Sequence, residues 1–289
     1  MGFILIVFNV IFNFYRLLGL APFKLITKPQ LRVTKSSVSY LYSATFTVIV
    51  TLILFVSTIF TLTDIAKTIA NKSFKLVVTI AFGLITFSPT VKSIVFLYSH
   101  LFKSQLLTTF INEGIGIYYS FAKCLIYFRG SSKNTHVFDS KFWLSIKIKI
   151  IAIAIQLLFI VGPFASFLTF SNNLIDQLVI LCIFYSHILQ ILMSFVYYVS
   201  MSVCLQYLRN IKICLQDEMY QIDTVSKVNS KKTMKIQRYC DLSDNIDRYT
   251  SLYNRTCTFA KHINDFFNNF LMVTFFYSFG FLICEVRVL

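Results

Sequence analysis

The chain has 289 residues, of which 56% are hydrophobic and only 13% are charged. Soluble globular domains carry about 25% charged residues, so this composition excludes an ordinary soluble domain and indicates a membrane protein. The formal net charge of +15 does not indicate nucleic-acid binding, because the basic residues flank apolar runs and form no single patch.

The N-terminal arm, residues 1–39, is basic and contains no acidic residue. Its first apolar run, Phe3–Phe12, is too short to span a bilayer, and it lacks the basic start and the cleavage site of a signal peptide. The basic residues of the arm are Arg16, Lys24, Lys28, Arg32 and Lys35. We expect the arm to be cytoplasmic and to lie on the anionic inner leaflet, so membrane lipid is a predicted partner.

Two apolar stretches that follow have the length of membrane crossings. Tyr40–Leu62 is about 23 residues long and uncharged, and a second stretch lies near Phe74–Leu97. Pro89 is expected to kink the second helix, and Lys92 is expected to extend toward lipid phosphate near its inner end.

The helical pattern of the second crossing continues into a basic inner loop. Gly114 and Gly116 are expected to interrupt this helix. Ile115–Phe128 is apolar but too short to span, and it contains Lys123, so we expect it to pack within the protein.

The third crossing is predicted at Ile148–Phe170, and the fourth helix begins near Leu174 and runs toward Leu208. With roughly 30 residues the fourth helix exceeds the ~20 that a crossing needs, so it should project from the bilayer. The large loop that follows, 206–265, has helical patterns on both sides of a turn at Ser226–Ser230. We therefore expect two cytoplasmic helices packed as a hairpin.

The stretch Lys232–Cys284 combines two kinds of helix without an intervening proline. Its first half carries apolar residues at steps of three and four, between charged ones, and this seam is predicted to mediate assembly. The residues of the seam are Tyr239, Leu242, Ile246, Tyr249 and Tyr253. From Phe266 onward the sequence is almost wholly apolar, which predicts a fifth crossing continuous with a cytoplasmic stem.

Lysine and arginine are concentrated in the arm and in the second and fourth loops, while the first and third loops carry few or none. Because basic loops face the cytoplasm, the N-terminus is predicted to be inside and the chain to end outside after five crossings. The predicted fold is an all-α, polytopic protein of the plasma membrane with long cytoplasmic helix extensions. The predicted parts are the arm 1–39, helices one to four 40–204, an anchor-like segment 205–265, and the fifth helix with its outer end 266–289.

The sequence predicts no enzyme and no metal or cofactor site. It contains no glycine-rich phosphate loop and no hydrolase or zinc-protease motif, and none of its seven cysteines forms a metal-ligand pair. A small-molecule pocket is a better candidate, because the outer halves of helices two to four present aromatic groups with a few polar ones. The predicted ligand-binding residues are Phe82, Phe87, Phe164, Phe167, Phe170, Tyr185 and His187.

Two of these predictions have simpler alternatives. His187 is a polar residue at membrane depth, which suggests a functional role, but it could equally pack against a neighbouring helix. Asn71 begins an Asn-Lys-Ser sequon in the first outer loop and is the predicted glycosylation site, although its closeness to the membrane could prevent modification.

Two stretches of the chain resemble the insect gustatory receptors, a chemoreceptor family related to the insect odorant receptors. They are Tyr15–Phe23 (YRLLGLAPF) and His262–Met272 (HINDFFNNFLM). The resemblance extends over nearly the whole chain, in the inside N-terminus, the long cytoplasmic helices and the order of the loops.

The resemblance implies a seven-helix fold that forms tetrameric, ligand-gated cation channels for small tastants. In that family the cytoplasmic helix extensions form a central anchor, and the seventh helix lines the pore and carries a Thr-Tyr and Gln-Phe motif. This sequence ends at Leu289 without that motif, so the chain is expected to be C-terminally incomplete and not to conduct alone.

Other functions remain open at this point. The chain could be a truncated, non-conducting partner subunit in a homo- or hetero-tetramer, a relative of the odorant receptors, or an unrelated membrane carrier. A G-protein-coupled receptor is disfavoured, because the N-terminus is predicted to be inside and no pair of outer-loop cysteines is present.

Overall fold

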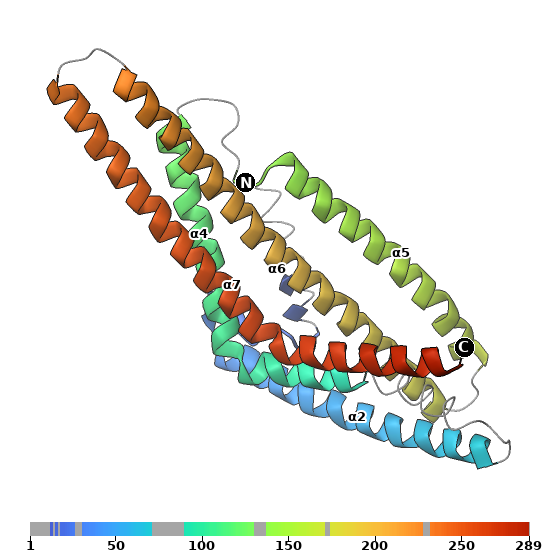
Figure 1. Cartoon of the computed structure of the whole chain (residues 1–289). Coiled ribbons are helices and arrows are strands. Elements are labelled where there is room, and N and C mark those ends of the chain that lie inside the picture. The colour runs from blue at the N-terminus through green and yellow to red at the C-terminus, as the bar shows by residue number, and fades with distance from the viewer. Residues whose placement is uncertain are drawn as a thin grey trace. The chain divides into compact units, whose positions relative to one another are not determined.

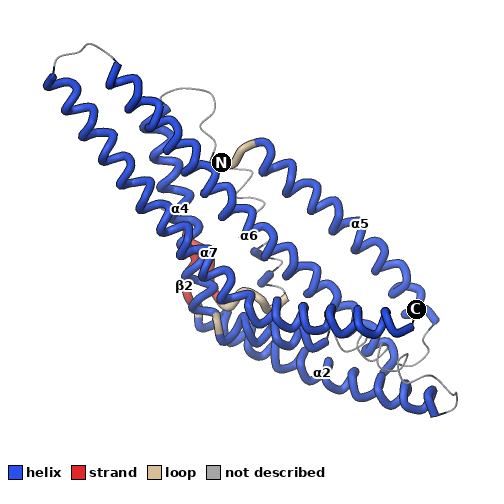
Figure 2. Tube along the Cα trace, in the orientation of Figure 1, coloured by secondary structure: helices blue, strands red, loops and turns tan. Residues whose placement is uncertain are grey.

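The computed structural model describes residues 12–13, 15–16, 18–26, 31–70, 90–129, 137–170, 174–227 and 232–288. Nearly all of these residues are helical, as the blue tube in Figure 2 shows, which confirms the all-α prediction. The labelled helices are α2 (Ser37–Ala70), α4 (Ser104–Arg129), α5 (Ser140–Phe170), α6 (Leu174–Lys227) and α7 (Lys232–Val288). A further helix spans Thr90–Phe102.

Three helical stretches among the described residues are long and apolar enough to cross a membrane: Ser37–Phe60, Ser140–Ser166 and a part of Ile183–Lys227. A fourth is present if Thr90–Phe102 and Ser104–Cys124, which meet at an angle of 76°, form one broken crossing. Large apolar side chains cover the outer face of α2, where such a surface is suited to lipid. These helices confirm a polytopic membrane protein. The total of five crossings stays a prediction, since residues 71–89 lie outside the described part.

The described residues form two compact units, which several helices share (Figure 1). Unit 1 comprises Met1–Thr108, Ile148–Val196 and Phe266–Leu289. Unit 2 comprises Thr109–Lys147 and Tyr197–Asp265. Unit 1 therefore contains most of the apolar crossings, and unit 2 contains the predicted cytoplasmic extensions of α6 and α7.

The N-terminal arm contains a small antiparallel sheet that the sequence analysis did not predict. Strands β1 (Phe23–Ile26) and β2 (Arg32–Lys35) pair with Phe23 opposite Lys35 and Ile26 opposite Arg32. Phe23 and Val33 are buried, whereas the basic side chains of Lys24, Arg32 and Lys35 are exposed. Alternation along the strands thus places Phe23 and Val33 on one face, with Lys35 at its end, and Lys24 and Arg32 on the other face.

The glycines of α4 do not interrupt the helix, so that expectation is wrong. The helix runs from Ser104 to Arg129 through Gly114 and Gly116. At Gly114 the absent side chain makes room for a neighbour, because a Cβ atom there would lie 2.9 Å from the ring of Phe259 in α7. The change of direction occurs instead at Lys103, where Thr90–Phe102 ends before α4 begins.

The start of α5 has a local cause in the sequence. The backbone N–H of Phe142 donates to Asp139 Oδ1 at 2.7 Å, so the aspartate caps the helix from just before its first turn. Helix α6 ends at Lys227 and helix α7 begins at Lys232, close to the turn predicted at Ser226–Ser230.

Candidate ligand site and assembly surface

Two predicted ligand-binding residues lie in one aromatic cluster of unit 1. The ring of Phe164 in α5 lies 6.2 Å from His187 and 5.2 Å from Phe184, both in α6. The ring of Tyr185 lies 6.2 Å from Phe46 of α2. The rings of Phe164, Phe184 and His187 thus form one half-buried cluster, and the contact of Tyr185 with Phe46 is a second one on the same stretch of α6.

For the remaining predicted ligand residues, the structure does not describe the side chains. Phe167 and Phe170 belong to α5, but their side chains are not described. Phe82, Phe87 and the predicted glycosylation site Asn71 lie outside the described residues. Their roles stay predictions.

A row of buried hydroxyl groups faces the interior of unit 1, and sequence reasoning missed it. Ser43 and Thr47 of α2 are 0% and 1% exposed. Their hydroxyls and that of Thr51 have no hydrogen-bond partner among the described residues, and the same is true of the hydroxyls of Tyr185 and Ser186 in α6. The signal was present in the sequence, because Ser43, Thr47 and Thr51 recur every four residues and so share one face of a helix.

These hydroxyls are chemically suited to hydrogen-bond a polar molecule. A buried hydroxyl without a partner costs on the order of 1–3 kcal/mol, so a row of them favours water or a bound ligand beside it. Together with the rings of Phe46 and Tyr185, the row gives unit 1 the combination typical of small-molecule sites, an apolar lining with a few hydrogen-bonding groups.

The structure divides the predicted assembly seam of α7 into two faces. Leu242 and Tyr249 are buried, at 5% and 2% exposure, whereas Tyr239, Ile246 and Tyr253 are exposed. The exposed three are seven residues apart and form one stripe along the helix, which we call the exposed stripe.

The buried face of α7 follows a regular heptad pattern within unit 2. Its positions alternate at steps of three and four residues, as in helices that pack along a continuous seam. They are Leu242, Asn245, Tyr249, Leu252, Thr256, Phe259 and Ile263.

Specific contacts join α7 and α6 to α4 in the same unit. The hydroxyl of Tyr207 in α6 donates to the backbone oxygen of Gly114 at 2.9 Å. Nδ1 of His262 in α7 lies 2.8 Å from Oε2 of Glu113. These contacts show that α4 packs against both α6 and α7 in unit 2.

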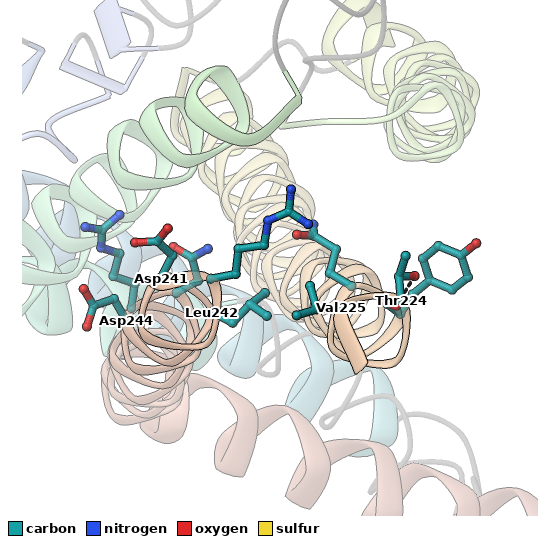
Figure 3. Close-up of a pocket in the computed structure, with 10 residues that line it drawn as sticks. Thr224, Val225, Asp241, Leu242 and Asp244 are labelled. Atoms are coloured by element: carbon teal, nitrogen blue, oxygen red, sulfur yellow. Dashed lines mark hydrogen bonds between the residues drawn. The ribbon is translucent and has the colours of Figure 1, made fainter. Parts of the chain in front are cut away.

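A cleft of about 470 Å³ lies where the end of α6 meets the start of α7 (Figure 3). In Figure 3 the side chains of Leu242 and Val225 point toward one another across the two helices. Polar and charged groups line the rest, including Arg238, Asp241 and Arg248. We interpret the cleft as the open end of the α6–α7 packing, because its apolar members continue the buried face.

Beside this cleft, Glu218 of α6 is 3% exposed. Its Oε1 accepts hydrogen bonds from Asn245 Nδ2 at 3.2 Å and from the hydroxyl of Tyr249 at 3.4 Å, while Oε2 has no partner among the residues that the structure describes. Burial raises the pKa of Glu218 above its ordinary value, with a smaller contribution from Asp217, and the two donors act in the opposite direction.

The replacement Glu218→Gln is expected to remove a pH dependence of stability. Because burial raises the native pKa of Glu218, the native state holds this proton to a higher pH than the unfolded chain does. The stability of the wild type should therefore fall as pH rises from the ordinary glutamate range through the raised value, by at most about 1.4 kcal/mol per pH unit. Thermal unfolding in detergent between pH 4 and 8 measures this slope, and an equal slope in both proteins would contradict it.

A sequence model of one family, described as 7tm chemosensory receptor, matches residues 8–286. The match covers both units and every described helix. A search of curated proteins finds no match.

Proposed function

Because the chain belongs to the 7tm chemosensory receptor family, we propose that it is a subunit of a ligand-gated cation channel that detects small tastants at the plasma membrane. The family is one of receptors and not of enzymes. The observation that supports a ligand site in this chain is the row of buried, unpartnered hydroxyls beside the rings of Phe46 and Tyr185. In our proposal, ligand binds the open state more tightly and thereby shifts the population toward it.

The proposed binding residues are Phe164 and His187 of the aromatic cluster, Tyr185 beside Phe46, and Phe167 and Phe170 further along α5. Phe82 and Phe87 stay in the proposal on the sequence pattern alone. A small tastant that hydrogen-bonds the hydroxyls and stacks on the rings would use both kinds of group.

Replacing His187 by phenylalanine is expected to lower the apparent affinity for a tastant at least tenfold while leaving the maximal current within about twofold. Phenylalanine keeps a ring in contact with Phe164 but removes the polar imidazole. The loss of a hydrogen bond from the imidazole to a ligand costs on the order of 1–3 kcal/mol of binding free energy. The measurement is a dose–response curve of whole-cell current after screening a tastant panel, with the chain co-expressed with a full-length receptor.

Tyr220→Phe is the matched control for that experiment, since Tyr220 is 74% exposed and lies in unit 2. If no tastant of the panel evokes a current in any combination of subunits, the result would count against the channel proposal. An unchanged dose–response curve for His187→Phe would count only against the site.

A second candidate function is a partner subunit that assembles with other receptor subunits but does not conduct by itself. The exposed stripe of Tyr239, Ile246 and Tyr253 favours it, because an apolar heptad stripe on a helix is suited to pack against another helix. Leu242 and Tyr249 would support such assembly indirectly, by fixing α7 within unit 2. Co-expression that changes the current of a full-length receptor, without current from the chain alone, would distinguish this function.

A further inference from the structure

The side chain of Lys92 is buried in unit 1, contrary to the expectation that it extends toward lipid phosphate. The residue is 5% exposed and lies in the helix Thr90–Phe102. A lysine ammonium inside a membrane bundle is costly unless an opposite charge or strong acceptors compensate it. The question is therefore which group compensates it.

The described side chains offer Lys92 no carboxylate. Of the twelve acidic residues in the chain, unit 1 contains only Asp64, Asp176 and Glu285, toward the ends of α2, α6 and α7. The side chains of these three are outside the described set. His187 is close enough to Lys92 for the charge of the ammonium to act on it, and a histidine cannot neutralise a cation.

A second, independent feature involves the next residue of the same helix. Ser93 donates its hydroxyl to the backbone oxygen of Ser186 at 3.4 Å, which joins this helix to α6. Ser186 is 0% exposed, and its own hydroxyl has no partner in the part of the chain that the structure describes. The Lys92 ammonium, which lies near His187, and the hydroxyl of Ser186, the residue before His187, are therefore both at the contact of these two helices. The described side chains provide no anionic acceptor there.

We propose that Lys92 and Ser186 form a binding site for the oxyanion of an amphipathic molecule. The oxyanion is either the phosphate of an anionic lipid or the carboxylate of a fatty-acid-like compound, since both accept several hydrogen bonds and both reach this depth with an apolar tail. The rings of Phe164 and Phe184 beside His187 supply apolar surface for such a tail. The site shares Phe164 and the surroundings of His187 with the proposed tastant site and therefore deepens that proposal. It is tested by binding and not by current, so the failure of one proposal can be distinguished from the failure of the other.

The test uses the purified full chain in nanodiscs of phosphatidylcholine, with thermal unfolding as the readout. Titration with laurate tests the carboxylate, and dodecanol is the neutral control with the same tail. Laurate should stabilise the wild type more than dodecanol does, and Lys92→Gln should weaken laurate binding at least tenfold. Lys24→Gln is the matched variant, since Lys24 is an exposed lysine of the same unit, and it should behave like the wild type.

A second arm distinguishes the lipid from the free carboxylate. The chain is extracted from membranes that contain phosphatidylglycerol, and native mass spectrometry then counts the retained anionic lipids. One lipid fewer on Lys92→Gln than on Lys24→Gln would assign the site to lipid phosphate, whereas a laurate effect alone would assign it to carboxylates.

Two results would overturn the proposal. One is equal stabilisation of the wild type by laurate and dodecanol together with equal lipid retention by all variants. The other is a Lys92→Gln chain that is more stable than the wild type under every lipid condition, since Lys92 would then be a neutral amine packed as an apolar group. If Lys92→Gln does not fold, Lys92→Arg keeps the charge and should keep the laurate effect, and its loss would also refute the site.

Discussion

Replacing Leu252 by aspartate is expected to destabilise unit 2 by on the order of 4 kcal/mol, enough to unfold it under mild conditions. Leu252 is 4% exposed at the centre of the buried face of α7, so the new carboxylate would lie between α7 and its neighbours without a partner. Thermal unfolding of the purified chain, followed by limited proteolysis within 197–265, measures the loss.

The neighbouring replacement Tyr253→Asp is the control and should have a different effect. Tyr253 is 50% exposed and belongs to the exposed stripe, so its replacement should change the free energy of unfolding by less than about 1 kcal/mol. If the stripe mediates assembly, Tyr253→Asp should also reduce co-purification of two differently tagged copies or of a full-length receptor. Equal stability of the two variants would contradict the buried face, and unchanged co-purification would contradict the assembly role.

The replacement Gly114→Leu is expected to destabilise unit 2 by about 1–3 kcal/mol, as overpacking does in well-packed contacts. Its Cβ atom alone would lie 2.9 Å from Cε2 of Phe259, a ring that is 4% exposed and therefore has little room to move. The hydrogen bond from the hydroxyl of Tyr207 to the Gly114 oxygen would be strained at the same time.

Gly162→Ala is the matched control for Gly114→Leu. Both glycines lie inside long helices, but no atom lies within 4 Å of the position that a Cβ on Gly162 would occupy. That variant should be neutral or slightly more stable, because alanine favours a helix by up to about 1 kcal/mol over glycine. A Gly114→Leu chain as stable as Gly162→Ala would refute the close contact between α4 and α7.

The division of α7 into an exposed stripe and a buried face could not be predicted from the sequence, because it depends on the helices that pack against α7. The sequence predicted a helix with an apolar seam at steps of three and four residues, and that periodicity is a local property of the chain. Tyr239, Leu242 and Ile246 look alike in such a pattern. Only packing against α6 and α4 decides that Leu242 is buried while the other two are exposed.

Gly114 illustrates the same difference for a turn signal. A glycine within a helical pattern of polar and apolar residues predicts an interruption of the helix, because glycine has a low helix propensity. In the folded chain the helix continues, since the contact with Phe259 and the hydrogen bond from Tyr207 favour a residue without a side chain at this point. Such a contact joins residues far apart in sequence and leaves no periodic signal.

The sequence by itself determined that this is an all-helical membrane protein of the chemosensory receptor family, with several apolar helices long enough to cross a membrane. Hydropathy and helical period are sums over neighbouring residues, so they can be read without a fold. The tertiary structure alone decided that Lys92 is buried, and that the hydroxyls of Ser43 and Thr47 are buried without a partner among the described residues. Burial depends on what other helices place against a residue, and for these groups those helices are distant in the chain.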